Sequence, residues 1–153
     1  KMLGYSPEVV LSGRRINEKM PSWLVERIIL QMSQRAMVIK QSRVLILGLT
    51  FKENCPDTRN TLVIKLFTNL KIYGIIPTIV DPLADKATVL NSYNIHIEND
   101  IDFTLKYSVI IVAVGHNKFK SLKSGQWRKL LVSNGFIFDL KNIVPSELDP
   151  IRI

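Results

Sequence analysis

The chain has 153 residues, of which 46% are hydrophobic and 22% charged, and its net charge is +8 at pH 7. This length is sufficient for one domain with a buried core, with or without a helical appendage, and no apolar run approaches the roughly 20 residues of a membrane span. The positive charge favours acidic ligands, but it is scattered along the chain, so we expect neither a nucleic-acid nor a membrane partner. The single cysteine, Cys55, excludes an internal disulfide and fits a reducing compartment such as the cytoplasm.

Apolar residues recur at helical spacing between residues 7 and 40. Pro21 interrupts the pattern and predicts either a kink in one long helix or the start of a second helix. The apolar face is wide and includes Trp23, Ile28 and Met32. Because the sequence offers no evident partner helix, we expect this face to be buried against a missing part of a longer protein or against a second copy. The opening has no signal-peptide pattern and is typical of the middle of a helical domain.

The stretch from residue 43 to residue 60 predicts a ligand site. It begins with the apolar run Val44–Leu47, which indicates a strand buried on both faces, and continues as a polar loop that carries Lys52 and Arg59. Open α/β sheets bind ligands where a strand, a loop and a helix N-terminus meet, and the free N–H groups and two cations suit a phosphate. The loop lacks the G-x-G-x-x-G and G-x-x-x-x-G-K-[ST] patterns, so Lys52 and Arg59 could equally be ordinary solvated charges.

Helix and strand patterns alternate in the rest of the chain. Asp57 or Thr58 is expected to cap a helix that runs from Leu62 to Tyr73 and ends at Gly74. Asp81 ends the next strand, where it could bind a ribose, although we expect it to cap the following helix. The remaining predicted elements are a strand at 77–80, a helix at 84–90, a short strand at 95–97, a central strand at 109–114, a helix at 126–132, a strand at 136–139 and an irregular tail from 144. This alternation predicts an α/β fold with a Rossmann-like, doubly wound parallel sheet.

Four blocks of the sequence, in the right order, resemble the UDP-glucose/GDP-mannose dehydrogenase family. Residues 48–60 look like its G-x-x-[FY]-K-x-x-x-x-D-x-R-x pattern, and residues 13–21 resemble the G-R-x-I-N-[DE]-x-M-P segment of its central helix. Residues 81–82 match a strand-end D-P. Residues 112–119 are similar to the V-A-V-x-H-x-x-F block of the branch that acts on UDP-N-acetylhexosamines.

The resemblance implies that residues 1–40 end a central helical dimerisation domain and that residues 41–153 form a C-terminal UDP-sugar-binding domain. It implies a full-length, cytoplasmic NAD-dependent 6-dehydrogenase that oxidises a UDP-N-acetylhexosamine to the uronic acid for surface polysaccharide synthesis, and a homodimer built through the N-terminal helices. The family's catalytic cysteine and NAD-binding domain are absent from this chain, and Cys55 is no substitute, so we expect the chain alone to be inactive and not to bind NAD. The alternative is a stand-alone nucleotide- or anion-binding regulatory module.

The resemblance also implies roles for individual side chains. Phe51 and Lys52 would contact the UDP-sugar, and Arg59 would reach the NAD pyrophosphate in the full enzyme. Arg14 would reach a substrate, often across the dimer, or would be a solvated helix charge. Residues 139–142 match the family's D-x-[RK]-x segment, and Lys141 is the cation retained there. Lys141 would help to bind the UDP-sugar, because lysine as well as arginine can meet a diphosphate.

Two histidines and one asparagine complete the candidates. His116 follows the central strand at its carboxyl end, and it is either a marker of the hexosamine branch or a loop histidine that caps the next turn. His96 lies within a predicted strand and is expected to be structural. Asn142 stands where other branches of the family carry an arginine, which weakens the case for a substrate contact there. No His, Cys or Asp residues have metal-ligand spacing.

Overall fold

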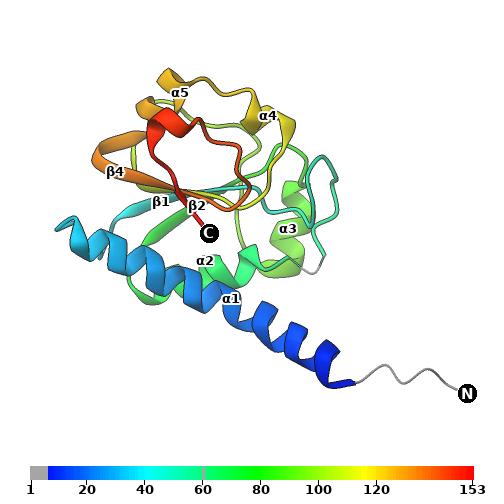
Figure 1. Ribbon diagram of the computed structural model, residues 1–153. Coiled ribbons are helices and arrows are strands. Elements are labelled where there is room, and N and C mark those ends of the chain that lie inside the picture. Colours follow the sequence, from blue (N-terminus) through cyan, green and yellow to red (C-terminus); the bar gives the residue numbers. More distant parts are fainter. Residues whose placement is uncertain (1–6, 60) are drawn as a thin grey trace, which may run out of the picture.

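The computed structural model describes residues 7–59 and 61–153, and in that part of the chain five parallel strands form one sheet in the order β2-β1-β3-β4-β5 (Figure 1). The strands are β1 (Arg43–Leu47), β2 (Ile76–Val80), β3 (Tyr107–Val112), β4 (Leu131–Asp139) and β5 (Ile151–Arg152). The helices are α1 (Pro7–Gln34), α2 (Val63–Ile72), α3 (Lys86–Tyr93), α4 (Asn117–Lys120), α5 (Ser124–Lys129) and the short 3-10 helix η1 (Ser146–Leu148). The predicted parallel α/β fold is confirmed.

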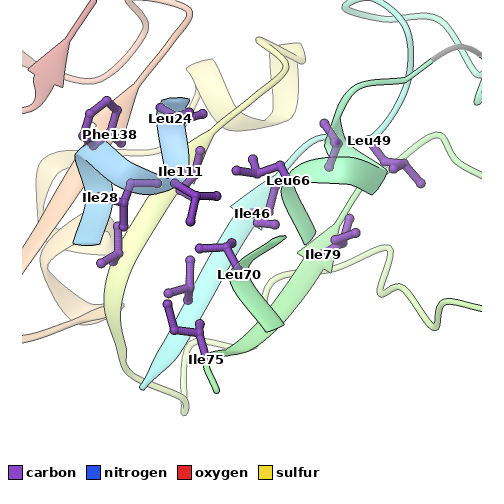
Figure 2. Close-up of a cluster of buried hydrophobic side chains, with 14 of the residues drawn as sticks. Leu24, Ile28, Ile46, Leu49, Leu66, Leu70, Ile75, Ile79, Ile111 and Phe138 are labelled. Atoms are coloured by element: carbon purple, nitrogen blue, oxygen red, sulfur yellow. The ribbon is translucent and has the colours of Figure 1, made fainter. Parts of the chain in front are cut away.

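Helices cover both faces of the sheet, as the doubly wound prediction requires. Successive side chains of a strand point to opposite faces, so β1 contributes Val44 and Ile46 to one core and Leu45 and Leu47 to the other. The first core lies under α1, α2 and α3, and Figure 2 shows the part of it beneath α1 and α2. The second core lies under α4 and α5, where Trp127 is fully buried. Burial on both faces explains the unbroken apolar runs of these strands.

The predicted neighbouring central strands are confirmed. β1 pairs in parallel with β3 in the register Val44 with Val109, and on its other side it pairs with β2. In contrast, residues 95–97 form no strand, and only the next residue, Glu98, makes an isolated bridge to Val80. The tail is less irregular than predicted, since it contains η1 and β5. The short helix α4 was not predicted.

α1 is one continuous helix that contains Pro21, so Pro21 does not start a second helix. The expectation that its apolar face lacks a partner within the chain is wrong. α1 packs against α2, and Ile28 and Met32 are fully buried in the first core. Trp23 remains on the outer side, where its side chain is 40% exposed. Figure 1 shows the first half of α1 projecting beyond the rest of the domain.

Two predicted helix caps are also wrong. α2 begins at Val63 with Leu62 at the N-cap position, so neither Asp57 nor Thr58 caps it. α3 is capped by Asp85, whose carboxylate accepts the Thr88 N–H, and not by Asp81. The predicted end of α2 is confirmed, because Gly74 follows the C-cap residue with φ of +73°.

Within residues 7–59 and 61–153, no helix has the length and apolar character that crossing a bilayer requires. The same residues contain no group of His, Cys, Asp and Glu side chains that is placed to hold a metal ion.

Candidate functional site

The order of the strands reverses direction between β1 and β3. The chain passes from β1 to β2 on one side and then crosses to β3 on the other. Open α/β sheets bind ligands beside such a switch point, outside the carboxyl ends of the strands. Here that position is bordered by the loop after β1, residues 48–62, and by the turn after β3, residues 113–116.

Gly48 lets these two segments come into close contact. Its φ is +99°, and a Cβ at this position would lie 2.4 Å from Cβ of Val114 and 2.8 Å from its backbone nitrogen. A side chain would therefore overlap the backbone after β3, and an L-residue would also be strained at this φ. The glycine brings the start of the loop directly against the exit of β3.

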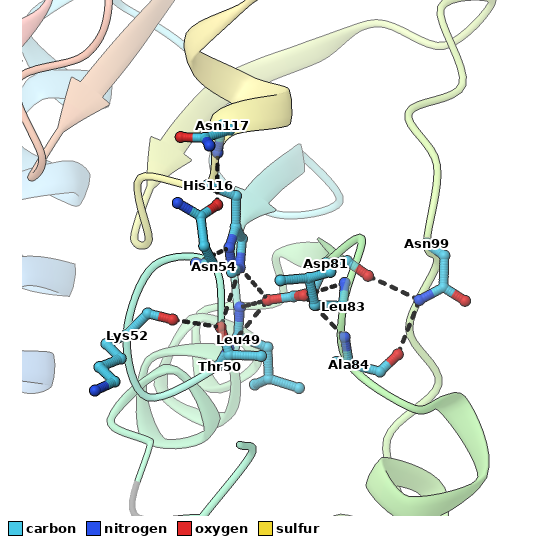
Figure 3. Close-up of polar contacts among 10 residues, drawn as sticks. All are labelled: Leu49, Thr50, Lys52, Asn54, Asp81, Leu83, Ala84, Asn99, His116 and Asn117. Atoms are coloured by element: carbon cyan, nitrogen blue, oxygen red, sulfur yellow. Dashed lines mark hydrogen bonds and ion pairs between the residues drawn. The ribbon is translucent and has the colours of Figure 1, made fainter. Parts of the chain in front are cut away.

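Asp81, at the end of β2, fixes the first residues of the loop. Its side chain is fully buried. Oδ2 accepts the N–H groups of Leu49 at 2.7 Å and Thr50 at 3.0 Å, and Oδ1 accepts those of Leu83 at 2.8 Å and Ala84 at 3.0 Å (Figure 3). One carboxylate thus joins the exits of β1 and β2.

His116 completes this network from β3. Its ring is 1% exposed, and its Nε2 lies 2.9 Å from Oδ2 of Asp81 and 3.0 Å from Oγ1 of Thr50. Its Nδ1 accepts the N–H of Asn54 at 3.0 Å, so the hydrogen-bond partners assign the ring proton to Nε2. Oδ1 of Asn54 in turn accepts the N–H of Asn117, the first residue of α4, at 3.0 Å. We call Thr50, Asn54, Asp81, His116 and Asn117 the loop clasp.

The loop clasp keeps Asp81 ionised. Burial alone would raise the pKa of Asp81, but the hydrogen bonds from His116 and from the backbone of Leu49 and Thr50 outweigh burial and lower the pKa below its usual range. Both carboxylate oxygens are already used, so Asp81 cannot bind a ribose. The exit of β1 carries a single glycine, Gly48, where the dinucleotide-binding fingerprint has three.

Most backbone N–H groups of residues 49–54 already have acceptors within the chain. Asp81 accepts two of them, His116 accepts that of Asn54, and the carbonyl oxygen of Asp57 accepts that of Phe51 at 2.8 Å. At the start of α2, Oγ1 of Thr61 accepts the N–H of Val63, the first residue of the helix. Fewer loop amides than expected are therefore left for a phosphate.

The tip of this loop differs from its base. The N–H groups of Lys52 and Glu53 have no acceptor in the described part of the chain. The side chain of Lys52 is exposed and points away from the loop clasp (Figure 3). Phe51 beside it is 62% exposed, which is unusual for a large apolar side chain. Both predicted ligand contacts thus face outward.

Lys141 lies beside the same loop. Asp139, buried at the end of β4, accepts the N–H of Lys141 at 3.1 Å and so orients the turn that carries it. A Cβ built on Gly115 would lie 3.5 Å from Cβ of Lys141 and 3.2 Å from a carboxylate oxygen of Glu53. The loop tip, the exit of β3 and the exit of β4 therefore meet, and Glu53 also pairs with Lys120 at 3.1 Å.

Lys141 also lines a cavity of about 330 Å³ between α1, α2 and the carboxyl ends of β3 and β4. The remaining lining is almost entirely apolar and includes Met20, Leu24, Leu66 and Ala113. An ammonium group at the edge of an apolar hollow suits a ligand that has both a charged part and a less polar part.

The two predicted arginines, Arg14 and Arg59, do not line this cavity. Arg59 is 84% exposed and pairs with Asp57 at 2.9 Å, and its hydrogen bonds hold the pKa of Asp57 at about 2. Arg14 is exposed on the first half of α1, which projects away from the sheet in Figure 1.

The loop clasp was not predicted from the sequence, and the helix-capping roles expected for Asp81 and considered for His116 were wrong. His116 makes no side-chain cap to α4, since Asn54 accepts the bond from the first turn instead. His96 is exposed. The sequence does contain one signal that could have pointed to the loop clasp. An aspartate directly follows an apolar run at Asp81, and the same pattern occurs at Asp139.

Comparison with known proteins agrees with this geometry. A family model described as the UDP binding domain of the UDP-glucose/GDP-mannose dehydrogenase family matches residues 45–146. The chain is 38% identical over 151 residues to UDP-N-acetyl-D-glucosamine 6-dehydrogenase of Salmonella typhi, and 34% identical over 151 residues to the enzyme of the same name from Pseudomonas aeruginosa. The alignments cover 99% of this chain but only 35% and 36% of the two relatives, so the chain spans about a third of their length.

A solved structure supports the fold. NDP-N-acetyl-D-galactosaminuronic acid dehydrogenase from Methanosarcina mazei Go1 superposes with a TM-score of 0.79 over 97% of this chain and 30% of that one. The sequence identity is 21%, so this likeness shows a shared architecture.

Proposed function

Because this chain belongs to the UDP-glucose/GDP-mannose dehydrogenase family, of which it carries the UDP-binding domain, we propose that it binds the substrate of a nucleotide-sugar 6-dehydrogenase. The full-length enzyme would oxidise C6 of a UDP-N-acetylhexosamine to the uronic acid, with NAD as oxidant, for surface polysaccharide synthesis in the cytoplasm. The relatives named for UDP-N-acetyl-D-glucosamine favour this substrate class.

The observation that carries the proposal is the outward tip of the loop after β1. Phe51 and Lys52 are exposed on a loop whose base is fixed at the switch point. Lys52 and Lys141 give two cations for the diphosphate. The apolar cavity beside Lys141 gives a surface for a less polar part of the ligand.

Calorimetric titration of UDP into the 153-residue chain tests this proposal. We expect saturable binding to one site that weakens as salt is added, because the diphosphate meets lysines. GDP should bind more weakly if the site recognises the nucleobase. Equal binding of UDP, GDP and inorganic pyrophosphate would indicate only a diffuse positive surface and would contradict a UDP site.

We expect the isolated chain to oxidise no substrate. It contains neither a thiol in the family's catalytic motif nor a dinucleotide site at its sheet edge, and the buried pair Asp81 and His116 does not face the ligand side. Absorbance of NADH in the presence of a UDP-sugar and NAD should stay flat. In the full-length enzyme, Arg59 would reach the NAD pyrophosphate after breaking its pair with Asp57.

We further propose a homodimer through the outer side of α1. Ile16, Met20, Trp23 and Leu30 are between 40% and 66% exposed there and follow one another at intervals of three, four or seven residues, so they share one stripe. Apolar area of this kind on one helix favours a second helix as its partner. Arg14, on the same half of α1, would then reach the substrate site of the partner subunit.

A further inference from the structure

We infer that His116 is a positioning residue for ligand binding, which acts through the loop clasp to hold residues 50–54 in the conformation that presents Lys52 to a diphosphate. The inference rests on the proposed function and deepens it. It makes the affinity for the ligand depend on a side chain that is 1% exposed and does not face the ligand itself.

The first reason is where the bonds of His116 lie. One ring nitrogen contacts Asp81 and Thr50 at the base of the loop, and the other accepts the N–H of Asn54 at its far end. Lys52 stands between these two points. A single rigid ring therefore fixes both ends of the segment that carries the exposed lysine.

The second reason is that contacts from outside the loop hold Asn54 in place. Asn54 has φ of +56°, a left-handed conformation that asparagine adopts more readily than most non-glycine residues. Its N–H donates to His116 and its side chain accepts from Asn117, so two neighbouring residues after β3 hold it from both sides. The hydroxyl of Thr50 also donates to the carbonyl oxygen of Lys52 at 3.1 Å.

The two nitrogens of His116 can be tested separately. In His116→Gln, the amide nitrogen can replace Nε2 as the donor to Asp81, but no acceptor remains for the Asn54 N–H. In His116→Asn, the amide oxygen can replace Nδ1 as that acceptor, but Asp81 loses its partner. The first variant releases the loop and keeps the buried contact, and the second does the reverse.

The experiment measures UDP affinity by calorimetry and thermal stability for the wild-type 153-residue chain and for both variants. We expect His116→Gln to weaken UDP binding about three- to tenfold, the effect of one lost neutral hydrogen bond, with a melting temperature close to that of the wild type. His116→Asn should melt lower than His116→Gln yet bind UDP more tightly. Backbone hydrogen exchange of residues 50–54 should be faster in His116→Gln without any ligand.

The matched control is His96→Gln, because His96 is the other histidine of the chain and is exposed. It should leave both affinity and stability unchanged. If affinity simply follows melting temperature among the variants, His116 has only a structural role and the inference is overturned. Equal UDP affinity of wild type and His116→Gln overturns it too and leaves the proposed function intact, whereas a wild type that binds no UDP overturns both.

If His116→Gln does not fold, Asn54→Gly tests the exposed end of the loop clasp. Glycine accepts the positive φ but removes the oxygen that holds Asn117. We expect UDP affinity to fall severalfold with little change in stability. Unchanged affinity in this variant overturns the inference.

Discussion

Two aspartates that directly follow buried strands organise the residues on the ligand side. Asp81 accepts backbone N–H groups from the loop after β1 and from its own turn, and Asp139 accepts those of Lys141 and Val144. A buried carboxylate has several acceptor positions, so it can satisfy donors from segments that are far apart in sequence. These two acids hold the turns that carry Lys52 and Lys141, the lysines that we propose to meet the diphosphate.

Asp81→Asn should destabilise the domain at neutral pH, because it replaces a charged acceptor with an amide that presents an N–H toward backbone donors. A loss of about 1.5–3 kcal/mol in the free energy of unfolding is expected. The pKa of Asp81 is lower in the folded chain than in the unfolded chain. Its contribution is therefore fully present above the unfolded pKa of about 4 and is lost as pH falls through the folded pKa.

Urea unfolding of wild type and Asp81→Asn at neutral pH and near pH 3 measures this difference. The gap between the two proteins should narrow near pH 3, because the Asp81 carboxylate is then protonated in the unfolded chain while it stays ionised in the folded one. A gap that stays constant with pH would mean that the charge of Asp81 contributes nothing.

Arg59→Ala should return the pKa of Asp57 from about 2 toward its ordinary value, because the hydrogen bonds from Arg59 are the main cause of the shift. Carbon-detected NMR titration of the Asp57 carboxyl measures this directly. The pair is exposed, so the melting temperature should barely change. A pKa that stays at about 2 in the variant would assign the shift to another group.

The sequence predicted ligand contacts at Phe51, Lys52 and Lys141 through the motifs that contain them, and these roles stay predictions. The structure places Glu53 of the same loop and Lys141 against Gly115. The sequence did not predict the contact between Asp81 and His116, because these residues are 35 positions apart and neither shows a periodic pattern. From the sequence, Asp81 and His116 were each considered as caps of the nearest helix. In the structure they contact each other instead.

Among the elements, strands were predicted better than helix boundaries. Runs such as Val44–Leu47 are apolar on both faces because both faces are buried, and this property is visible in the sequence. The cap of α2 was predicted too early in the chain, at Asp57 or Thr58, whereas Leu62 occupies the N-cap position. Asp57 instead accepts a hydrogen bond from Arg59 within the loop. The packing of α1 on α2 could not be inferred, because one amphipathic face fits several partners equally well.

Gly48→Ala tests the close contact between β1 and β3. The new methyl group would overlap the backbone of Val114 and would be strained at φ of +99°. We expect a loss of about 3 kcal/mol or more in the free energy of unfolding, measured in urea. Gly125→Ala is the matched control, because Gly125 lies in α5 with no atom within 4 Å of the new methyl group. It should be neutral or stabilising by about 0.5–1 kcal/mol, and equal losses in both variants would contradict this view of Gly48.

In the molecule as a whole, the outer side of α1 leaves the apolar stripe of Ile16, Met20, Trp23 and Leu30 exposed. Sedimentation equilibrium of the wild-type chain should show a dimer, and Trp23→Glu should shift it toward monomer, because a charge would replace the exposed aromatic of that stripe. The control is Ile76→Glu, which changes an exposed apolar residue of β2. A wild-type chain that is monomeric at high concentration would contradict the proposed dimer.

We propose above that this domain recognises the diphosphate of a UDP-sugar through the tip of the loop after β1. UDP titration into wild type, Lys52→Ala and Arg59→Ala tests it most directly, because both variants remove one exposed cation of the same loop. Lys52→Ala should weaken binding by roughly one to two powers of ten, which corresponds to a lost charge-assisted hydrogen bond of about 1.5–3 kcal/mol. Arg59→Ala should have little effect, since Arg59 is paired with Asp57 and its proposed partner is NAD. Equal losses in the two variants would mean that only the overall positive charge matters, and the assignment of the site would be wrong.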